Sequence, residues 1–255
     1  LTAIINALED KTQLTLAGDL GQKILEHRDF GQWQGLLRDL GLNGVEVLSL
    51  SVAYRSTYQI YELAETVRNP KVKDEELTLT PKFGPVPKLA SCGGFSDAVA
   101  WASTWIQEIH SKNPKAIGSI ICRTRKEAHQ VFDALIKIGT HGIRLGDESH
   151  FAFTPGFTVT DVRQVKGLEF RYVLIFNPSE KNYRYSNLQD RNQLYVAITR
   201  AEQRLDMVCY DPPSRFIPSF IPVDDLNEVL ENEDQPLFSD GDQDLSRFEK
   251  DDDEW

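Results

Sequence analysis

The residues best suited to chemistry lie in the middle of the chain, at Lys166, Gly167 and Glu169. An apolar run at 157–159 precedes them and another at 172–176 follows, so they are predicted to connect two buried strands, a position where α/β proteins place ligand-binding groups. Glycine lets a backbone approach a phosphate closely, lysine supplies a positive charge, and glutamate accepts hydrogen bonds from ribose hydroxyls. The segment is typical of a loop that binds a phosphate and a sugar.

Two earlier segments also place polar side chains after predicted strands. Asp19 and Gln22 follow the apolar run 13–17 and offer a carboxylate and an amide. Tyr54 and Arg55 follow an alternating run at 45–52, and they offer a ring for stacking on a purine and a guanidinium for pairing with phosphate. Each segment has a plainer alternative: the first is only a Gly-Asp turn, and the second is a packed tyrosine beside a solvated arginine.

Arginines mark two further positions. Arg123 and Arg125 follow a predicted strand, where they either hold a nucleic-acid backbone or only charge the start of a helix. A helix predicted at 193–204 has an apolar stripe, and Arg200 lies off that stripe, so it is expected to point away from the core. Arg200 is then either a phosphate contact, in the manner of an arginine finger, or a surface side chain.

Strands and helices alternate around these groups. The expected elements are a strand, a helix, a strand, a helix, a strand and a later closing strand, at 87–91, 95–111, 116–122, 126–138, 143–145 and 207–210. This order predicts a parallel sheet with helices on its faces.

Composition limits the class of protein. The chain has 255 residues, of which 40% are hydrophobic, and this is enough to bury a core. No window approaches the roughly 18 consecutive apolar residues of a membrane span, and no signal-peptide pattern opens the chain. Cys92, Cys122 and Cys209 are predicted to be buried free thiols. We therefore expect a cytoplasmic protein with no membrane partner, and, because Leu1 is not methionine, a fragment of a longer one.

The negative charge is concentrated at one end. The net charge is −11, yet residues 222–255 hold fourteen acidic residues against Arg247 and Lys250, which leaves +1 for residues 1–221. The acidic balance therefore does not exclude a nucleic-acid partner for the body of the chain. The acidic segment is either disordered and solvated, or a docking segment that uses its aromatic residues as anchors or mimics nucleic acid.

Together the four segments resemble, in their order, the later motifs of UvrD/Rep-type superfamily 1 helicases. The resemblance spans residues 14–211 and rests on Gly18-Asp19-x-x-Gln22, Tyr54-Arg55-Ser56, Val165-Lys166-Gly167-Leu168-Glu169-Phe170 and Leu194-Tyr195-Val196-Ala197-Ile198-Thr199-Arg200-Ala201. In that family two RecA-like domains clamp ATP while single-stranded nucleic acid crosses their top surface.

The resemblance implies an α/β fold, a RecA-like parallel sheet flanked by helices of the P-loop NTPase type. Residues 1–43 would be the last strand and helix of the first RecA-like domain, 44–222 the second domain, and 223–255 an acidic, flexible, disordered-type tail. The missing N-terminal RecA-like domain, single-stranded DNA or RNA, and RNA polymerase or another protein at the tail are the expected partners.

Residue roles also follow from the resemblance alone. The catalytic residues would be Gln22, which senses the γ-phosphate, and two arginines that bind it from across the cleft, Arg55 and Arg200. Tyr54 would stack on adenine, Glu169 would face the ribose, and the other nucleotide contacts would be Asp19 and Gly167. The nucleic-acid contacts would be Arg123, Arg125, Arg163 and Lys166. The implied cofactor is ATP with Mg²⁺, the metal being held by residues outside this chain.

The sequence departs from the family pattern in three places. Asp161 and Arg163 stand where the family usually has threonine and histidine, and Ile24-Leu25 stand where aromatic residues are common. Only about thirty residues separate Arg125 from Thr158, so the large accessory insertion is missing, as in the HelD-like branch that acts on RNA polymerase.

The parts that would cradle and cleave a phosphate are also missing from the sequence. It contains no Gly-x-x-x-x-Gly-Lys-Ser/Thr and no strand ending in Asp-Glu. We therefore expect the C-terminal half of an ATP-dependent helicase or translocase that hydrolyses ATP negligibly alone. The alternative is a non-catalytic interaction module, or an RNA-polymerase-associated HelD-like factor that uses ATP as a switch.

Overall fold

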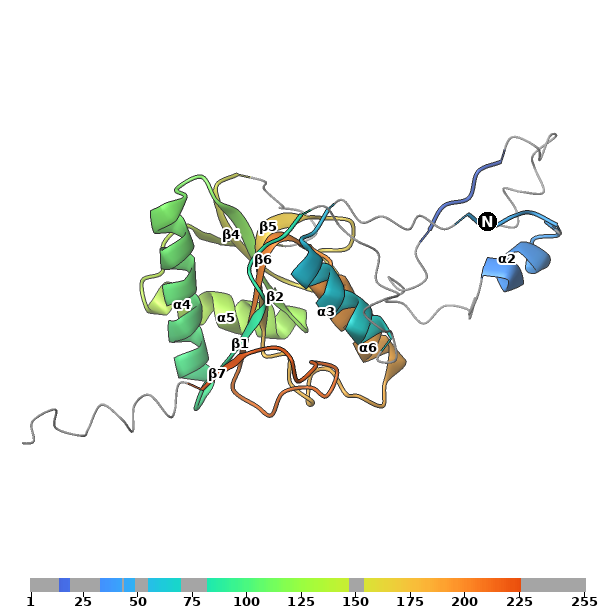
Figure 1. The fold of residues 1–255 in the computed structure, drawn as a ribbon. Coiled ribbons are helices and arrows are strands. Elements are labelled where there is room, and N and C mark those ends of the chain that lie inside the picture. The colour runs from blue at the N-terminus through green and yellow to red at the C-terminus, as the bar shows by residue number, and fades with distance from the viewer. Residues whose placement is uncertain are drawn as a thin grey trace, which may run out of the picture.

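A parallel sheet forms the centre of the molecule (Figure 1). The computed structural model describes residues 14–18, 33–42, 44–48, 55–69, 82–146 and 154–225. Within them seven strands pair in the order β3-β4-β2-β5-β6-β1-β7, and every pair is parallel. The strands are β1 Lys88–Ser91, β2 Ile117–Cys122, β3 Ile143–Leu145, β4 Gly156–Asp161, β5 Phe170–Phe176, β6 Ala201–Cys209 and β7 Val223–Asp225. The predicted α/β fold with a parallel RecA-like sheet is confirmed.

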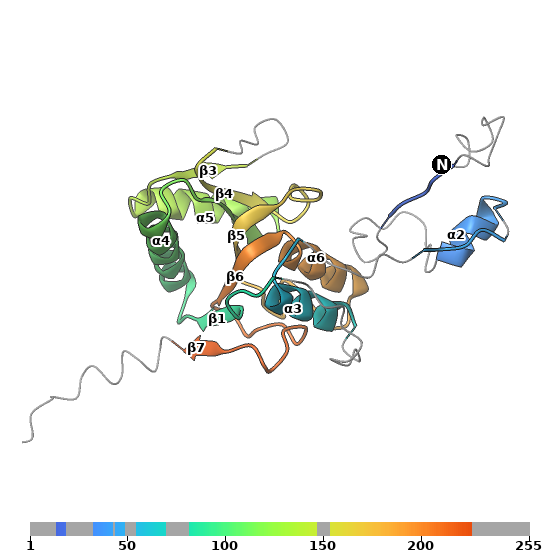
Figure 2. The same ribbon diagram turned by 45° about the horizontal axis from the view of Figure 1, so that its top comes forward.

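Helices cover both faces of the sheet, as Figures 1 and 2 show. One face carries α3 (Tyr58–Arg68) and α6 (Leu188–Ile198), and the other carries α4 (Phe95–Lys112) and α5 (Arg125–Lys137). Because successive side chains of a strand point to opposite faces, β5 contributes to two cores. Val173 and Ile175 join the first core, and Leu174 and Phe176 join the second. The central strands β2 and β4 are accordingly buried along almost their whole length.

The helix α2 (Trp33–Asp39) belongs to a separate small cluster. Leu36 and Leu40 pack there with Leu14 and Leu16. Strands were predicted at 13–17 and 45–52, but the described residues 14–18 and 44–48 form none. Neither segment has a strand to pair with among the described residues, and in the second Val45 and Leu48 are exposed.

The end of α6 differs from the prediction. The helix was expected at 193–204, but it spans Leu188–Ile198, and β6 begins at Ala201. β6 pairs with β5 on one side and β1 on the other, so its residues gain two ladders of backbone hydrogen bonds. That pairing outweighs the helical spacing of the apolar residues at 194–205.

The chain returns to the sheet after β6. Phe216 and Ile221, from an apolar segment at 216–223, are buried against the first core. The strand β7 then pairs with β1, so the first three residues of the segment assigned to the acidic tail belong to the sheet. The rest of that segment, residues 226–255, lies outside the described residues.

Two observations concern the protein's surroundings. Cys92, Cys122 and Cys209 are free and buried, as predicted. Among the described helices, none is both long and apolar enough to cross a lipid bilayer.

Candidate nucleotide-binding site

Three of the four motif segments meet at one end of the sheet. The Ser56 hydroxyl donates to the Ala201 carbonyl at 2.6 Å, and the Phe170 amide donates to the Arg200 carbonyl at 2.9 Å. These bonds join the start of α3, the loop before β5 and the turn before β6. The fold therefore brings together residues 145 positions apart in the sequence. The remaining predicted nucleotide residues lie outside the described part of the chain: Asp19, Gln22 and Tyr54.

The meeting point lies at the amino ends of β5 and β6. Because β4 and β5 are both parallel to β2, the loop 162–169 has to run from the carboxyl end of β4 to the amino end of β5. Gly167 and Glu169 come immediately before β5, and so they lie at the amino end. The general rule that α/β proteins bind ligands at the carboxyl ends of strands would have placed this site at the opposite edge.

Two predicted nucleotide residues form an ion pair across the segments. Arg55 Nε lies 2.6 Å from Glu169 Oε1, and the two side chains are 56% and 30% exposed. Solvent-exposed ion pairs of this kind contribute at most about 1 kcal/mol. The Arg55 guanidinium can therefore exchange this carboxylate for another anion at little cost, and both groups face the solvent side of the site.

Arg200 does not point away from the core, as the sequence predicted. The side chain is 1% exposed, and its guanidinium donates to the carbonyls of Val196 and Leu168 and to the hydroxyl of Thr199, at 3.0, 3.0 and 3.1 Å. The prediction was wrong because α6 ends at Ile198, so Arg200 lies in the turn before β6 and not on the helix surface. The arginine ties the end of α6 to the residue between Gly167 and Glu169.

Gly167 is required by its backbone conformation. Its φ is +85°, in the left-handed region that L side chains rarely adopt, while a Cβ added there would meet nothing within 4 Å. The space beside this glycine is therefore open, as the approach of a ligand to the loop requires.

A pocket of about 360 Å³ lies beside the start of α3. It is lined by Thr57 from the start of α3, by residues 82–85 and by Glu202 and Gln203 at the start of β6. The Lys82 ammonium lies 3.4 Å from the Arg55 carbonyl, which places this wall directly beside the segment that carries Arg55. No sequence pattern predicted this wall, because residues 82–85 belong to an irregular connection.

Three of the four predicted nucleic-acid residues, Arg123, Arg125 and Arg163, belong to a different edge. Cys122 and Asp161 are register partners on β2 and β4, so the residues that follow them lie close together at the carboxyl ends of these strands. Arg125 and Arg163 are exposed there, whereas the exposed Lys166 directly precedes Gly167 and so lies towards the amino end of β5.

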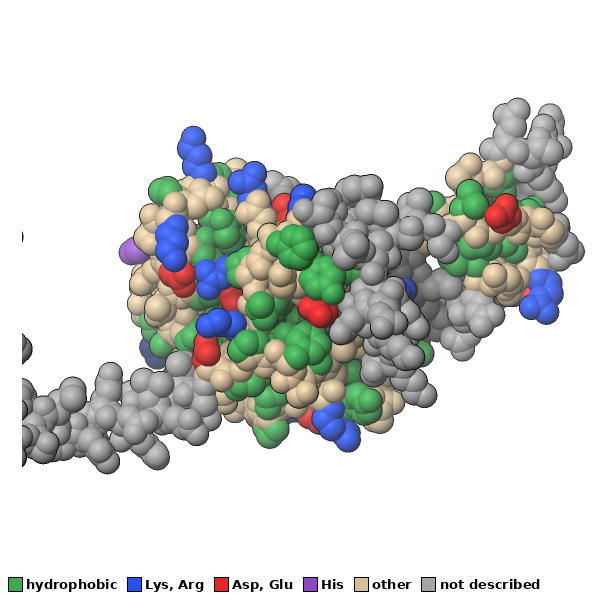
Figure 3. All heavy atoms as spheres, viewed as in Figure 1, with side chains coloured by type: hydrophobic (Ala, Val, Ile, Leu, Met, Phe, Trp, Pro, Cys, Tyr) green, Lys and Arg blue, Asp and Glu red, His purple; other side chains and the backbone are tan. Residues whose placement is uncertain are grey.

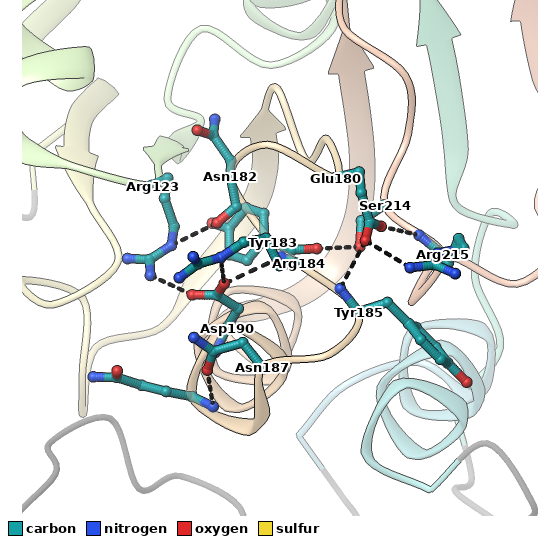
Figure 4. A network of polar contacts seen from close by, with 11 residues as sticks. Arg123, Glu180, Asn182, Tyr183, Arg184, Tyr185, Asn187, Asp190, Ser214 and Arg215 are labelled. Carbon is teal, nitrogen blue, oxygen red and sulfur yellow. Dashed lines mark hydrogen bonds and ion pairs between the residues drawn. The ribbon is translucent and has the colours of Figure 1, made fainter.

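Arg123 is engaged within the fold (Figure 4). Its guanidinium donates to Asp190 Oδ1 at 2.7 Å and to the Asn182 carbonyl at 2.9 Å, and it lies 5.5 Å from the centre of the Tyr183 ring. The side chain is only 17% exposed. Arg123 therefore fastens the loop after β5 to the end of β2. Asn187 caps α6 by accepting from the Asp190 amide, and so it holds the first turn of the helix that carries Asp190.

A second polar crevice opens at this carboxyl edge. β2 leads to α5 on one face, and β5 leads to α6 on the other, so the crevice between them is the switch point of the sheet. A pocket of about 210 Å³ lies there, lined by Thr124, Lys126, Glu127, Gln130, Asn177, Lys181, Asn182 and Tyr210. Burial raises the pKa of Glu127, although the Arg123 amide and the Asn182 side chain both donate to its carboxylate.

Comparisons with known proteins bear on the fold that carries these residues. Residues 156–208 match the family model of the UvrD-like helicase C-terminal domain, a stretch that includes Gly167, Glu169 and Arg200. Among solved structures, the C-terminal domain of a possible DNA helicase from Lactobacillus plantarum WCFS1 is similar, with 22% sequence identity and a TM-score of 0.54. The similarity covers 67% of this chain and 98% of that chain, and it shows a shared fold. No curated protein matches the chain.

Proposed function

Since residues 156–208 carry a UvrD-like helicase C-terminal domain, we propose that this chain is the second RecA-like half of an ATP-dependent superfamily 1 helicase or translocase. The observation that carries the proposal is the convergence of Arg55, Gly167, Glu169 and Arg200 at the amino ends of β5 and β6. In this proposal residues 1–43 complete the first RecA-like domain, residues 44–222 form the second, and the protein works in the cytoplasm.

The described residues fit one side of a nucleotide. Two guanidiniums provide positive charge, the open Gly167 backbone admits a phosphate, and Glu169 accepts hydrogen bonds from ribose hydroxyls. Asp19, Gln22 and Tyr54 are assigned to the nucleotide by the motif resemblance alone. Mg²⁺ and the phosphate cradle belong to a partner domain with a P-loop, because this sequence contains none.

The role of the two arginines is charge stabilisation. Phosphoryl transfer depends mainly on positioning and on neutralising the charge of the transferred group, so cations that arrive from a second domain can control the rate. Arg55 is already exposed, whereas Arg200 has to leave its carbonyl partners or shift with the end of α6. ATP turnover is thereby coupled to closure of the two domains.

Single-stranded nucleic acid would bind at the opposite edge of the sheet. Arg125 and Arg163 are exposed there, and Arg123 positions the loop beside them. Separate edges for ATP and for the strand mean that closure on ATP can move the strand-binding edge as a rigid unit.

The strand-binding role has a direct salt test. Arg163→Ala is expected to weaken the binding of a labelled single-stranded oligonucleotide to the chain, for all sequences alike, because a phosphate contact is lost. The slope of log K against log salt should fall in magnitude by about 0.7, the amount expected for one contact on a single strand. Fluorescence anisotropy over a salt series measures both.

Lys112→Ala is the matched control for this titration. Lys112 is an exposed cation at the C-terminal end of α4, an end that lies away from the proposed strand-binding edge. Its loss should change neither the affinity nor the slope. An unchanged slope for Arg163→Ala would remove this residue from the proposed track.

A non-catalytic role is the second candidate, and Asp161 favours it. The carboxylate is 5% exposed and accepts a hydrogen bond from the Arg163 amide at 2.9 Å, so it stabilises its own loop and presents no hydroxyl to a strand. In this case the chain is an interaction module, or a HelD-like factor that binds RNA polymerase and uses ATP as a switch. Steady ATP turnover stimulated by single strands in the longer protein would exclude it.

A further inference from the structure

The loops after β5 and β6 form a second cationic surface, distinct from the four residues assigned by the motifs. Lys181 comes from the loop after β5. Figure 4 shows Arg184 and Tyr185 from the same loop and Arg215 from the loop after β6. All four are exposed, with 62% of the Arg184 side chain, 43% of Tyr185 and 69% of the Arg215 side chain open to solvent. We call these four residues the loop surface.

The loop surface is held in place by two carboxylates. Glu180 accepts hydrogen bonds from the Tyr185 amide at 3.0 Å, the Arg215 amide at 3.1 Å and the Arg215 guanidinium at 3.1 Å. These bonds lower the pKa of Glu180, with the Tyr185 amide as the largest cause, so the carboxylate stays ionised. Asp190 accepts from both the amide and the guanidinium of Arg184 at 3.1 Å.

Hydrogen bonds between the two loops complete the scaffold. The Ser214 hydroxyl donates to the Tyr183 carbonyl at 2.5 Å, and the Glu180 amide donates to the Pro212 carbonyl at 2.9 Å. The surface is therefore preorganised, and a ligand that binds it does not have to pay for ordering these loops.

The loops after β2, β4, β5 and β6 expose charged side chains of one sign only. In the described loops after β2, β4, β5 and β6, including the first turn of α5, every exposed charged side chain is a cation: Arg125, Lys126, Arg163, Lys166, Lys181, Arg184 and Arg215. The acidic side chains of these loops are buried or half-buried, and most are engaged as hydrogen-bond acceptors of the fold, as Glu127, Asp161, Glu180 and Asp211 are. By contrast, acidic and basic side chains are interspersed on the face shown in Figure 3. These four loops are therefore complementary to a polyanion, whereas the loop after β1 leads to the exposed Asp97 at the start of α4.

An aromatic ring accompanies the cations. The Tyr185 ring centre lies 5.0 Å from the Arg215 guanidinium carbon and 5.0 Å from the Phe216 ring centre, while 43% of the residue stays exposed. A supported aromatic ring beside arginines is the combination that binds single strands, because any base can stack on it while its phosphates meet the guanidiniums. A purely acidic peptide has no group that would use the ring.

The two cationic groups are continuous. Lys126, which stands beside Arg125, and Lys181 of the loop surface line the same 210 Å³ pocket between α5 and the loop after β5. A strand that contacts Arg125 and Arg163 can therefore continue across this pocket without meeting an exposed acidic side chain of these loops.

We propose that the loop surface of Lys181, Arg184, Tyr185 and Arg215 binds single-stranded nucleic acid, with a base stacked at Tyr185 and phosphates held by the three cations. This inference rests on the proposed function for its ligand class, and it extends the strand-binding edge from β4 and β2 to β5 and β6. It assigns a role to four residues that the motifs leave without one.

The test uses the full chain and a fluorescein-labelled oligothymidylate of 20 nucleotides. Tyr185→Ala is expected to weaken binding about tenfold, within the range for loss of one stacked base, whereas Tyr185→Phe keeps the ring and binds like the wild type. Lys181→Ala should weaken binding and reduce the salt slope by about 0.7. Lys137→Ala, an exposed lysine at the far end of α5, is the matched control and should bind normally.

A second measurement does not depend on how the variants fold. Ultraviolet cross-linking of wild-type chain to an oligonucleotide containing 5-iodouracil, followed by peptide mass spectrometry, should place an adduct on Tyr185. Absence of an adduct from the loops after β5 and β6, with adducts elsewhere on the chain, overturns the proposal.

The outcomes distinguish a failure of the loop surface from a failure of the proposed function. Normal binding by Tyr185→Ala and Lys181→Ala, together with weak binding by Arg163→Ala, overturns the loop surface and leaves the proposed function standing. Failure of the wild-type chain to bind any single strand removes the proposed ligand class itself. A third outcome is that polyglutamate competes with the oligonucleotide and binds Tyr185→Ala and the wild type with equal affinity. This result would indicate an acidic protein partner, and it would also overturn the proposal.

Discussion

Replacing Arg55 with alanine, in a protein that joins this chain to the proposed P-loop domain, is expected to lower ATP turnover about 10³-fold, the scale of an arginine finger. The loss should fall on the rate of the chemical step, because Arg55 stabilises charge on the transferred phosphoryl group and not on the resting nucleotide. Steady-state phosphate release at saturating ATP measures it. Stability should hardly change, since the ion pair with Glu169 is exposed.

Arg68→Ala is the matched control for this measurement. Arg68 is at the other end of α3, its side chain is 48% exposed, and it also pairs with a glutamate, Glu65. The glutamate of this pair is buried, so the variant costs at least as much stability as Arg55→Ala, but it has no place in the nucleotide site. Turnover by Arg55→Ala equal to that of Arg68→Ala would refute the role of Arg55.

Replacing Arg200 with alanine is expected to have two effects, of which the first is a loss of stability of about 3 kcal/mol. The substitution leaves a cavity and removes the donor to the Val196 and Leu168 carbonyls at the junction of α6, β6 and the loop before β5. Equilibrium urea unfolding of the chain should show a lower midpoint with an unchanged slope. Turnover by this variant falls for a structural reason as well as a chemical one.

Arg200→Lys separates the two causes. Lysine keeps the charge and most of the buried stem, and it can reach one carbonyl, so we expect stability between those of the wild type and Arg200→Ala. Its point charge does not reproduce the planar guanidinium, so ATP turnover should still drop by a large factor. A wild-type unfolding midpoint for Arg200→Ala would contradict the buried position of this side chain.

Much of the fold follows from local patterns in the sequence. The helices expected at 95–111 and 126–138 occur at Phe95–Lys112 and Arg125–Lys137, because each has a regular apolar stripe. For α5 there is also a start signal, since Thr124 accepts from the Glu127 amide. Continuous apolar runs correctly indicated strands buried on both faces.

The segment around Arg200 shows where such patterns fail. Leu194, Ala197, Ile198, Ala201 and Leu205 fit a helix, but Ala201 and Leu205 also fit the strand that is formed. The segment becomes a strand because it can pair with β5 on one side and β1 on the other. Those two partners are distant in the sequence, so a short stretch around residue 200 does not reveal them. The burial of Arg200 follows from that choice, and so it could not be predicted either.

For the candidate site, too, one part could be predicted from the sequence and another part could not. That Arg55, Gly167, Glu169 and Arg200 converge was implied by the motif order, but their position at the amino ends of β5 and β6 depends on the long parallel connection 162–169. The engagement of Arg123 by Asp190 joins residues 67 apart in the sequence, so it needed the structure.

The central claim, that this chain holds one half of a shared ATP site, is tested most directly by ATP turnover of the purified chain, alone and joined to its P-loop domain. We expect no turnover by the chain alone, and turnover by the joined protein that Arg55→Ala abolishes. Turnover by the chain alone at the rate of the joined protein would contradict the claim.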